Sequence, residues 1–367
     1  MRVLILTQRI DLDDPILAFI HKWIEKLAQR VESLYCVGLA VGRHSLDQFG
    51  VKVFSLGKER GYRFFPDLRY LLNLYRILRE IERDGGADII FSHMAPVFSI
   101  AVAPYAFWRR LPVIQWYAHP SSGWRQRIAH RLSSRVVTSL PTTYPYIDNK
   151  VTVIGQGIDA DFFSPDRGDI QAGRAPLILY VGRLSQVKDL TSLLHAAARL
   201  RKRSIKPFRV VIVGGPLTVE DEGYESSLKK LSEQLNLDGL LSFEGPVPHG
   251  EELVNWYRRC TVHVNLTPLG FGDKVMLEAM SCGKISLATN EGFREVLGNV
   301  AEKLLFHSGD VEDLAQKLLW ALNLASEDRN RIGLSLRERV IKMHGLDRLM
   351  DRLVELFNDL LTNPARA

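Results

Sequence analysis

Short apolar runs alternate with helical patterns along the whole chain, and this alternation limits the possible folds more than any other feature. It is typical of parallel α/β units. In the first half we predict strands at residues 3–6, 34–37, 51–56, 89–92, 113–117, 136–139 and 151–154. The pattern then restarts, with strands at 177–181, 210–213, 240–243, 262–266 and 285–288. The chain is therefore expected to form two doubly wound α/β domains in tandem, with ligands bound at the strand carboxyl ends in the cleft between them.

The domain limits follow from composition. A length of 367 residues suits about two domains. Residues 167–176, rich in Gly, Pro and charge, are the best linker candidate. We predict domains at 1–165 and 166–345, and an amphipathic helix at 348–361 within the closing segment 346–367. Another helix is predicted to start near Pro15, and its apolar residues are spaced for one helix face: Ile16, Phe19, Ile20, Trp23, Ile24 and Leu27.

Composition also excludes several classes of protein. With 46% hydrophobic and 25% charged residues, the chain is neither disordered nor fibrous. Three cysteines without a CxxC pair encode neither a disulfide framework nor a zinc site. The apolar start is too short for a signal peptide, so we expect a cytoplasmic protein. Residues 89–108 are long enough to cross a membrane, but Pro96 and Pro104 interrupt them, and we predict a strand, a turn and a buried helix there.

Charge is unevenly distributed. Residues 1–155 hold 21 basic and 13 acidic side chains, whereas residues 156–367 hold 27 and 29. The basic excess gathers with aromatic residues at 58–70, 108–110 and 124–127. Any one of these clusters is more simply a solvated helix face, but together they favour peripheral contact with an anionic membrane, at its cytoplasmic side. Nucleic acid is the competing anionic partner, but no nucleic-acid-binding module is recognisable.

A loop after the strand at 177–181 carries the sharpest local pattern. Gly182 and Arg183 end this strand, and Lys188 precedes a helical run at 190–200. Helix N-termini favour anions, so the two cations suit a diphosphate. An Arg and a Lys solvated beside an ordinary loop explain the pattern equally well.

A second glycine loop opens a short helix that contains Glu278. The loop consists of Gly270, Phe271, Gly272, Asp273 and Lys274. One helical turn separates Lys274 from Glu278, so the carboxylate can face the same cleft and accept hydrogen bonds from a ribose diol. The alternatives are an exposed helix glutamate and, for Asp273, a helix cap.

Candidates in the first half end other strands. His119 follows the strand at 113–117 and can contact substrate or act as an acid or base, although a lone histidine is more often structural. His93, Thr138 and Ser139 hold similar positions with a weaker case.

Two further glycine turns follow predicted strands. Residues 155–160 match GxGxxA, but no helix follows, so we rank a dehydrogenase low and read Gly157 as a close-approach glycine at the interdomain edge. Gly215 either admits a phosphate or sugar or only makes a turn.

Taken together, these motifs resemble family 4 glycosyltransferases of the two-domain, Rossmann-like GT-B fold, over essentially the whole chain. Gly182, Arg183, Lys188, the turn at 157–159 and residues 273–283 fall in the family's order and spacing. Residues 7–23 and 116–119 are similar to bacterial members that act in cell-envelope polysaccharide synthesis.

This resemblance implies a retaining hexosyltransferase that needs no metal or other cofactor. Arg183 and Lys188 would bind the diphosphate of a nucleotide-sugar donor, Glu278 the ribose, and Val247 would meet the base. His119 would line the reaction centre and face a glycan or lipid-linked acceptor. The family's usual acidic residue is Gly270 here, so the resemblance assigns its sugar contact to Asp273 or the loop backbone. A non-catalytic nucleotide-sugar-binding subunit and a nucleotide-sugar epimerase stay open as alternatives.

Overall fold

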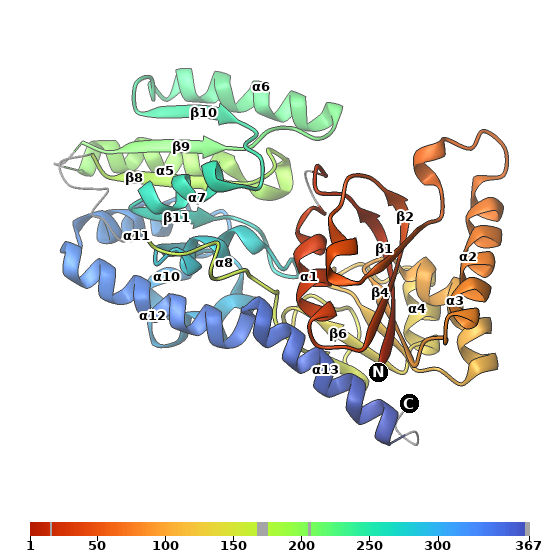
Figure 1. Cartoon of the computed structure of the whole chain (residues 1–367). Coiled ribbons are helices and arrows are strands. Elements are labelled where there is room, and N and C mark those ends of the chain that lie inside the picture. The colour runs from red at the N-terminus through yellow and green to blue at the C-terminus, as the bar shows by residue number, and fades with distance from the viewer. Residues whose placement is uncertain (15–16, 167–174, 205–206, 364–367) are drawn as a thin grey trace. The chain divides into compact units, whose positions relative to one another are not determined.

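A computed structural model describes residues 1–14, 17–166, 175–204 and 207–363 (Figure 1). The chain divides into two compact units, one of Met1–Gly157 with Leu346–Ala367 and the other of Ile158–Gly345. The C-terminal helix thus belongs to the first unit. The predicted helix start at Pro15 and most of the predicted linker lie outside the described residues.

The first unit contains a seven-stranded parallel sheet, and every strand predicted for it is confirmed. The strands are β1 (Arg2–Ile10), β2 (Ser33–Val41), β3 (Lys52–Ser55), β4 (Ile89–His93), β5 (Val113–Trp116), β6 (Arg135–Thr138) and β7 (Val151–Val153). They lie in the order β3-β2-β1-β4-β5-β6-β7. Because the order reverses between β1 and β4, the switch point of this sheet lies there.

Helices cover both faces of this sheet. They are α1 (Phe19–Ala28), α2 (Pro66–Arg83), α3 (Pro96–Arg109), α4 (Trp124–Leu132) and α13 (Leu346–Thr362), with short turns η1 (Leu46–Phe49) and η2 (Lys58–Arg60). Val3 and Ile5 of β1 pack in one core cluster with residues of α1 and α13. Leu4 and Leu6 pack in another with residues of α2 and α3. This split follows from the two-residue period of a strand, which sends alternate side chains to opposite faces.

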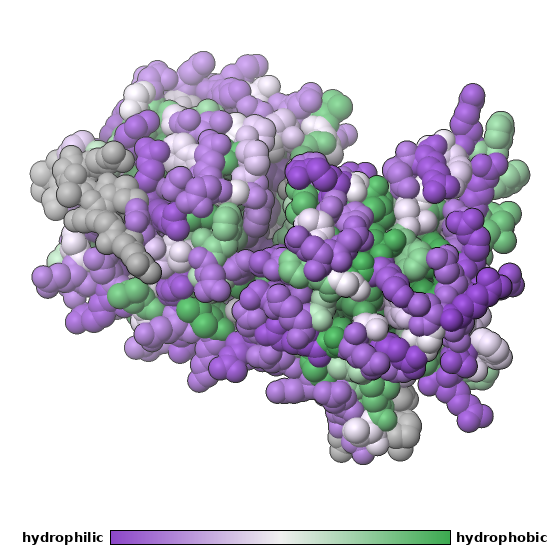
Figure 2. All heavy atoms as spheres, in the orientation of Figure 1, coloured by the Kyte–Doolittle hydropathy of each residue, from purple (hydrophilic) through white to green (hydrophobic). Residues whose placement is uncertain are grey.

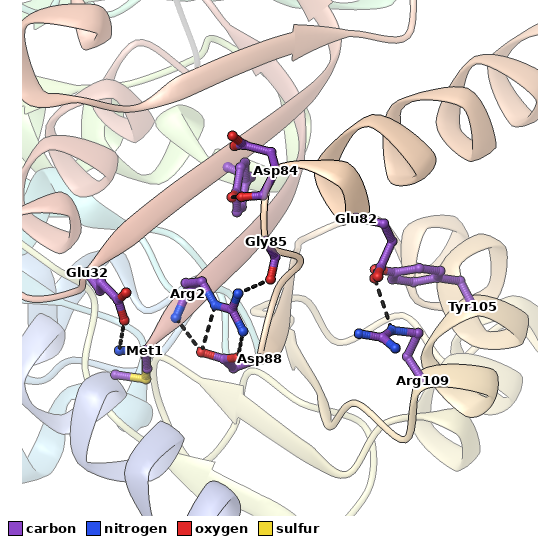
Figure 3. A network of polar contacts seen from close by, with 10 residues as sticks. Met1, Arg2, Glu32, Glu82, Asp84, Gly85, Asp88, Tyr105 and Arg109 are labelled. Carbon is purple, nitrogen blue, oxygen red and sulfur yellow. Dashed lines mark hydrogen bonds and ion pairs between the residues drawn. The ribbon is translucent and has the colours of Figure 1, made fainter.

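Ion pairs join neighbouring elements of the first unit. Arg30, which follows the C-terminal end of α1, contacts Asp347 and Asp351 of α13 at 2.8 and 2.9 Å. In Figure 3, Arg2 of β1 meets Asp88 at 2.7 Å, just before β4 begins. Both contacts join segments that are far apart in sequence, so they stabilise the packing of one element against another rather than a single helix or strand.

The apolar stretch at 89–108 forms β4 and most of α3, so the strand, turn and helix are confirmed. The prediction that this helix is buried is only partly confirmed. Phe98 and Val102 are buried, but Phe107 and Trp108 are 88% and 72% exposed. Across the described ranges, the structure contains no helix with the length and apolar character needed to span a bilayer.

The second unit contains a five-stranded parallel sheet in the order β10-β9-β8-β11-β12. Its strands are β8 (Leu177–Val181), β9 (Arg209–Val213), β10 (Leu241–Gly245), β11 (Val262–Asn265) and β12 (Ile285–Ala288). Its helices are η3 (Gln186–Lys188), α5 (Leu190–Arg203), α6 (Val219–Gln234), α7 (Glu251–Arg259), α8 (Lys274–Ser281), η4 (Glu291–Phe293), α9 (Arg294–Leu297), η5 (Gly298–Val300), α10 (Ala301–Leu304), α11 (Val311–Asn323) and α12 (Ser326–His344). The switch point lies between β8 and β11, where ligands of open α/β sheets bind.

Candidate functional site

Most predicted site residues follow the carboxyl ends of strands in the second unit. Gly182, Arg183 and Lys188 follow β8, Gly215 follows β9, Val247 follows β10, and Gly270, Phe271, Gly272, Asp273 and Lys274 follow β11. Because these strands are parallel, their carboxyl ends share one edge of the sheet.

Three turns at this edge touch one another. The backbone N–H of Gly182 donates to Val213 at 3.0 Å, and that of Gly214 donates to Gly245 at 2.8 Å. A β carbon at Gly214 would overlap the carbonyl oxygen of Gly182, and the φ of Gly214 is +137°. The turn after β9 therefore requires glycine because two backbones meet there.

A largely buried ion pair bridges the switch point. The Lys188 Nζ lies 2.5 Å from the Asp273 carboxylate and donates to Thr267 Oγ1 at 2.7 Å. Asp273 also accepts hydrogen bonds from Thr267 and from Asn265 Nδ2, the latter at 3.1 Å. Burial alone raises the pKa of Asp273, but the charge of Lys188 and these hydrogen bonds outweigh it and lower that pKa. Asp273 is therefore a carboxylate paired with Lys188.

The capping interpretation of Asp273 is wrong. Asp273 occupies the N-cap position of α8, but its side chain makes no capping hydrogen bond. Its carboxylate is used instead across the switch point, where Lys188 supplies a full charge and a helix terminus would supply only a partial one.

The surroundings of Arg183 and Lys188 differ from each other. Arg183 is 42% exposed, and its Nε lies 3.7 Å from Asp221 of α6. Lys188 ends a short turn before α5 begins, and Asp189 caps that helix by accepting from the Ser192 N–H. One of the helix N–H groups expected to meet an anion is therefore already bonded to a carboxylate.

Glu278 is 3% exposed, which excludes the exposed-glutamate interpretation. Its Oε1 lies 3.2 Å from His249 Nε2, and its Oε2 accepts from the Tyr257 hydroxyl at 2.9 Å. Burial and then the charge of Glu278 raise the pKa of Tyr257 well above its usual value, so this hydroxyl stays protonated and donates. The two contacts fix the plane of the carboxylate.

His249 and Tyr257 were not among the predicted site residues. They lie 29 and 21 residues from Glu278 in sequence, and no local pattern links them to it. The Phe163 ring packs against both, with centroids 5.2 Å from His249 and 6.0 Å from Tyr257.

Lys274 and the rest of its loop are held from several sides. Burial lowers the pKa of Lys274 to about 7, against the opposing charge of Glu278. The Phe271 carbonyl accepts from Asn290 Nδ2 at 2.8 Å. Among the described residues, no group of three His, Cys, Asp or Glu side chains is arranged to hold a metal ion.

The candidates of the first unit lie in different environments. His119 Nδ1 accepts from the Ser121 N–H at 3.1 Å. His93 is buried beside Thr7, with Nδ1 and Oγ1 3.2 Å apart, and Thr138 and Ser139 both contact Thr143. These last three side chains have structural partners within the core.

Gly157 belongs to the first unit, at its junction with the second in sequence. Trp23 Nε1 donates to its carbonyl at 3.4 Å, and a β carbon at Gly157 would meet the Trp23 ring. The turn therefore needs glycine at this position because the Trp23 ring lies against it.

Comparison with known proteins relates most of the second unit to a known family. Residues 166–339 match the model of glycosyl transferases group 1. Two curated relatives are named D-inositol 3-phosphate glycosyltransferase, from Frankia alni (33% identical over 46% of this chain and 44% of the relative) and Thermomonospora curvata (29% over 57% and 51%). The chain thus spans about half the length of the curated relatives it matches.

Solved structures match over nearly the whole chain. A glycosyltransferase from Rickettsia africae gives a TM-score of 0.77 at 16% identity, with 99% of each chain covered. Anabaena HepE in complex with UDP gives 0.76 at 17% identity, with 98% and 100% covered. Sucrose-phosphate synthase from Thermosynechococcus elongatus gives 0.73 at 17% identity, with 99% and 100% covered. The chain therefore has the GT-B fold, and residues 166–339 are similar to the glycosyl transferases group 1 family.

Proposed function

We propose that the chain is a family 4, retaining glycosyltransferase that moves a hexosyl group from a nucleotide-diphosphate sugar to a glycan, a lipid-linked or another cell-envelope acceptor. One observation carries the proposal. Two cations follow β8, one of them is paired with Asp273 at the start of α8, and α8 contains the buried carboxylate of Glu278, whose plane two donors fix. The UDP complex of HepE and the names of the curated relatives support the donor class.

Arg183 and Lys188 are proposed to stabilise the leaving diphosphate. Breaking a sugar–phosphate bond builds negative charge on that group, and preorganised cations lower the energy of the transition state. Asp273 holds Lys188 in place at 2.5 Å, so the amine is already oriented before a donor arrives.

Glu278 is proposed to accept hydrogen bonds from the ribose diol on the lone pairs that His249 and Tyr257 leave available. Gly270 has no side chain that could contact the sugar, so Asp273 or the loop backbone is proposed to make that contact. The donor is also proposed to contact Gly157, Gly182, Gly215, Val247, Phe271, Gly272 and Lys274. His119 is the proposed acceptor-side catalytic residue, and no metal or cofactor takes part.

The test is a panel of nucleotide sugars. The correct donor is expected to raise the melting temperature of the protein, since saturating ligand stabilises by a few kcal/mol. With that donor, Arg183→Ala and Lys188→Ala are each expected to lower transfer by about 10²–10³-fold, as loss of one such donor group does. Lys230→Ala, at an exposed position of α6, is the matched control. Transfer at the wild-type rate by both site variants would refute the proposal.

The same assay separates the alternatives. Donor binding without hydrolysis or transfer would identify a non-catalytic subunit, and conversion of the donor sugar into its epimer would identify an epimerase. The anomeric configuration of the product tests retention, and undiminished transfer in the presence of a chelator tests metal independence.

A further inference from the structure

The helices α2, α3 and α4 form one layer on the first sheet. Tyr75 of α2 donates to the Ala101 carbonyl of α3 at 3.2 Å, and Arg109 of α3 pairs with Glu82 of α2 at 3.0 Å (Figure 3). The helix α3 in turn packs against α4. We call the solvent-facing side of these three helices the α2–α4 face.

The outward side of α2 is both apolar and basic. Leu74, Ile77, Leu78 and Ile81 bury its inner side. The outer positions follow the i, i+3, i+4, i+7 spacing of one stripe: Phe65, Leu68, Arg69, Leu72, Arg76 and Arg79. Phe65 and Leu72 are 77% and 62% exposed. A helix of a soluble protein usually has a polar outer side, whereas apolar and basic residues together are typical of a helix at a membrane interface.

The neighbouring helices extend the same character. The 14 residues of α3 contain one charged side chain, Arg109, and its outer side ends in the exposed Phe107 and Trp108. On α4, Trp124 is 67% exposed, and the Arg125 guanidinium lies 5.2 Å from its ring centroid. Aromatic rings that carry arginines are suited to the headgroup level of a bilayer.

The charge of the α2–α4 face is strongly positive. The three helices contain eight arginines and three acidic residues, a net charge of 8 − 3 = +5. One of the acidic residues, Glu82, is paired with Arg109. Figure 2 shows hydrophobic and hydrophilic side chains mixed along the edge that α2 forms in Figure 1.

We propose that the α2–α4 face docks on an anionic lipid bilayer. The arginines attract acidic headgroups, and the exposed aromatic and leucine side chains enter the interface. A second copy of the chain fits poorly, because pairing this face with itself would place arginines against arginines. Nucleic acid would engage the arginines but leave Phe107 and Leu72 in water. The docking does not depend on the proposed transferase activity, because it requires no donor.

The test is flotation of the full chain with vesicles of phosphatidylcholine, with and without phosphatidylglycerol, and no nucleotide sugar. Binding is expected only to the anionic vesicles and should weaken as salt rises. Each arginine near such a surface contributes roughly fivefold to binding, so the triple variant Arg69→Gln/Arg76→Gln/Arg79→Gln should bind about a hundredfold more weakly. The variant Phe107→Ser/Trp108→Ser should also bind more weakly.

The control is Arg331→Gln/Leu334→Ser on α12, which removes one exposed arginine and one exposed apolar side chain outside the α2–α4 face. The control should bind as tightly as the wild type. The triple arginine variant removes only exposed side chains, so an unchanged melting temperature will show that it is folded. The proposal would be overturned if this variant bound anionic vesicles with wild-type affinity, or if the wild type bound uncharged vesicles equally well. It would also be overturned if duplex DNA displaced the protein from the vesicles.

Discussion

Replacing Lys188 by methionine removes one half of a buried ion pair and leaves the other half in place. The two side chains are 18% and 17% exposed, so solvent screens them little. After the substitution, the Asp273 carboxylate keeps hydrogen bonds from Thr267 and Asn265 but no counter-charge nearby. We therefore expect the folded state to lose free energy relative to the unfolded state.

The size of this loss follows from the partners that remain. Removing one member of a buried pair costs roughly 3–5 kcal/mol. Because two neutral donors still bind Asp273, we expect the lower end, about 3 kcal/mol, which corresponds to a fall in melting temperature of roughly 6–12 °C for a unit of this size. The double variant Lys188→Met/Asp273→Asn removes the unpaired charge and should recover most of the loss.

The pH dependence gives an independent check. The pKa of Asp273 is lowered in the wild type, so its contribution is present above the unfolded-state pKa and is lost as the pH falls through the lowered value. In the variant Lys188→Met, Asp273 loses the charge that lowers its pKa most, so we expect its pKa to be higher than in the wild type and protonation to relieve the unpaired charge at a higher pH. The difference in stability between wild type and variant should therefore narrow as the pH falls from neutral to mildly acidic.

Differential scanning calorimetry of the wild type, both single variants and the double variant, at neutral and at mildly acidic pH, measures all of these quantities. The reasoning is refuted if Lys188→Met costs less than about 1 kcal/mol at neutral pH, the upper limit for an exposed pair. It is also refuted if the double variant is no more stable than Lys188→Met alone.

Three further predictions concern Gly214, Tyr257 and Lys274. Gly214→Ala should destabilise the protein by several kcal/mol because its β carbon would overlap a carbonyl oxygen of the turn after β8, whereas Gly223→Ala in α6, with open space around it, should stabilise it by about 0.5–1 kcal/mol; equal melting temperatures would contradict this. Tyr257→Phe removes a 2.9 Å hydrogen bond to the Glu278 carboxylate, and we expect a loss of roughly 1.5–3 kcal/mol in unfolding experiments and weaker nucleotide binding; unchanged values of both would exclude the positioning role. Burial lowers the pKa of Lys274 to about 7, so above neutral pH the unfolded chain binds a proton that the folded chain lacks. The free energy of unfolding should therefore rise with pH above neutral in the wild type, and less so in Lys274→Met. Parallel pH profiles of the two proteins in urea unfolding would refute this lowered pKa.

The secondary structure could be predicted from the sequence because its signals are local. All twelve predicted strands exist, with ends displaced by a few residues, since a short apolar run between turn residues identifies a buried strand wherever it lies in the fold. The loops that follow β8 and β11 could be predicted for the same reason, because glycines and charged residues directly after an apolar run form a local pattern. The closing helix was predicted at 348–361 and is observed at Leu346–Thr362.

The order of the strands and the partners of the side chains depended on tertiary structure. Lys188 and Asp273 are 85 residues apart, and only the placement of β11 beside β8 brings them together. The same holds for His249 and Tyr257 at Glu278, and for Trp23 at Gly157. Likewise, the composition of α3 predicts an apolar helix, but only packing against the sheet decides that one side is buried and that Phe107 and Trp108 face solvent. The sequence by itself thus determined the elements and the chemistry at their ends, because both depend on adjacent residues. The pairing of those ends depends on chain segments that meet only after the sheets have formed.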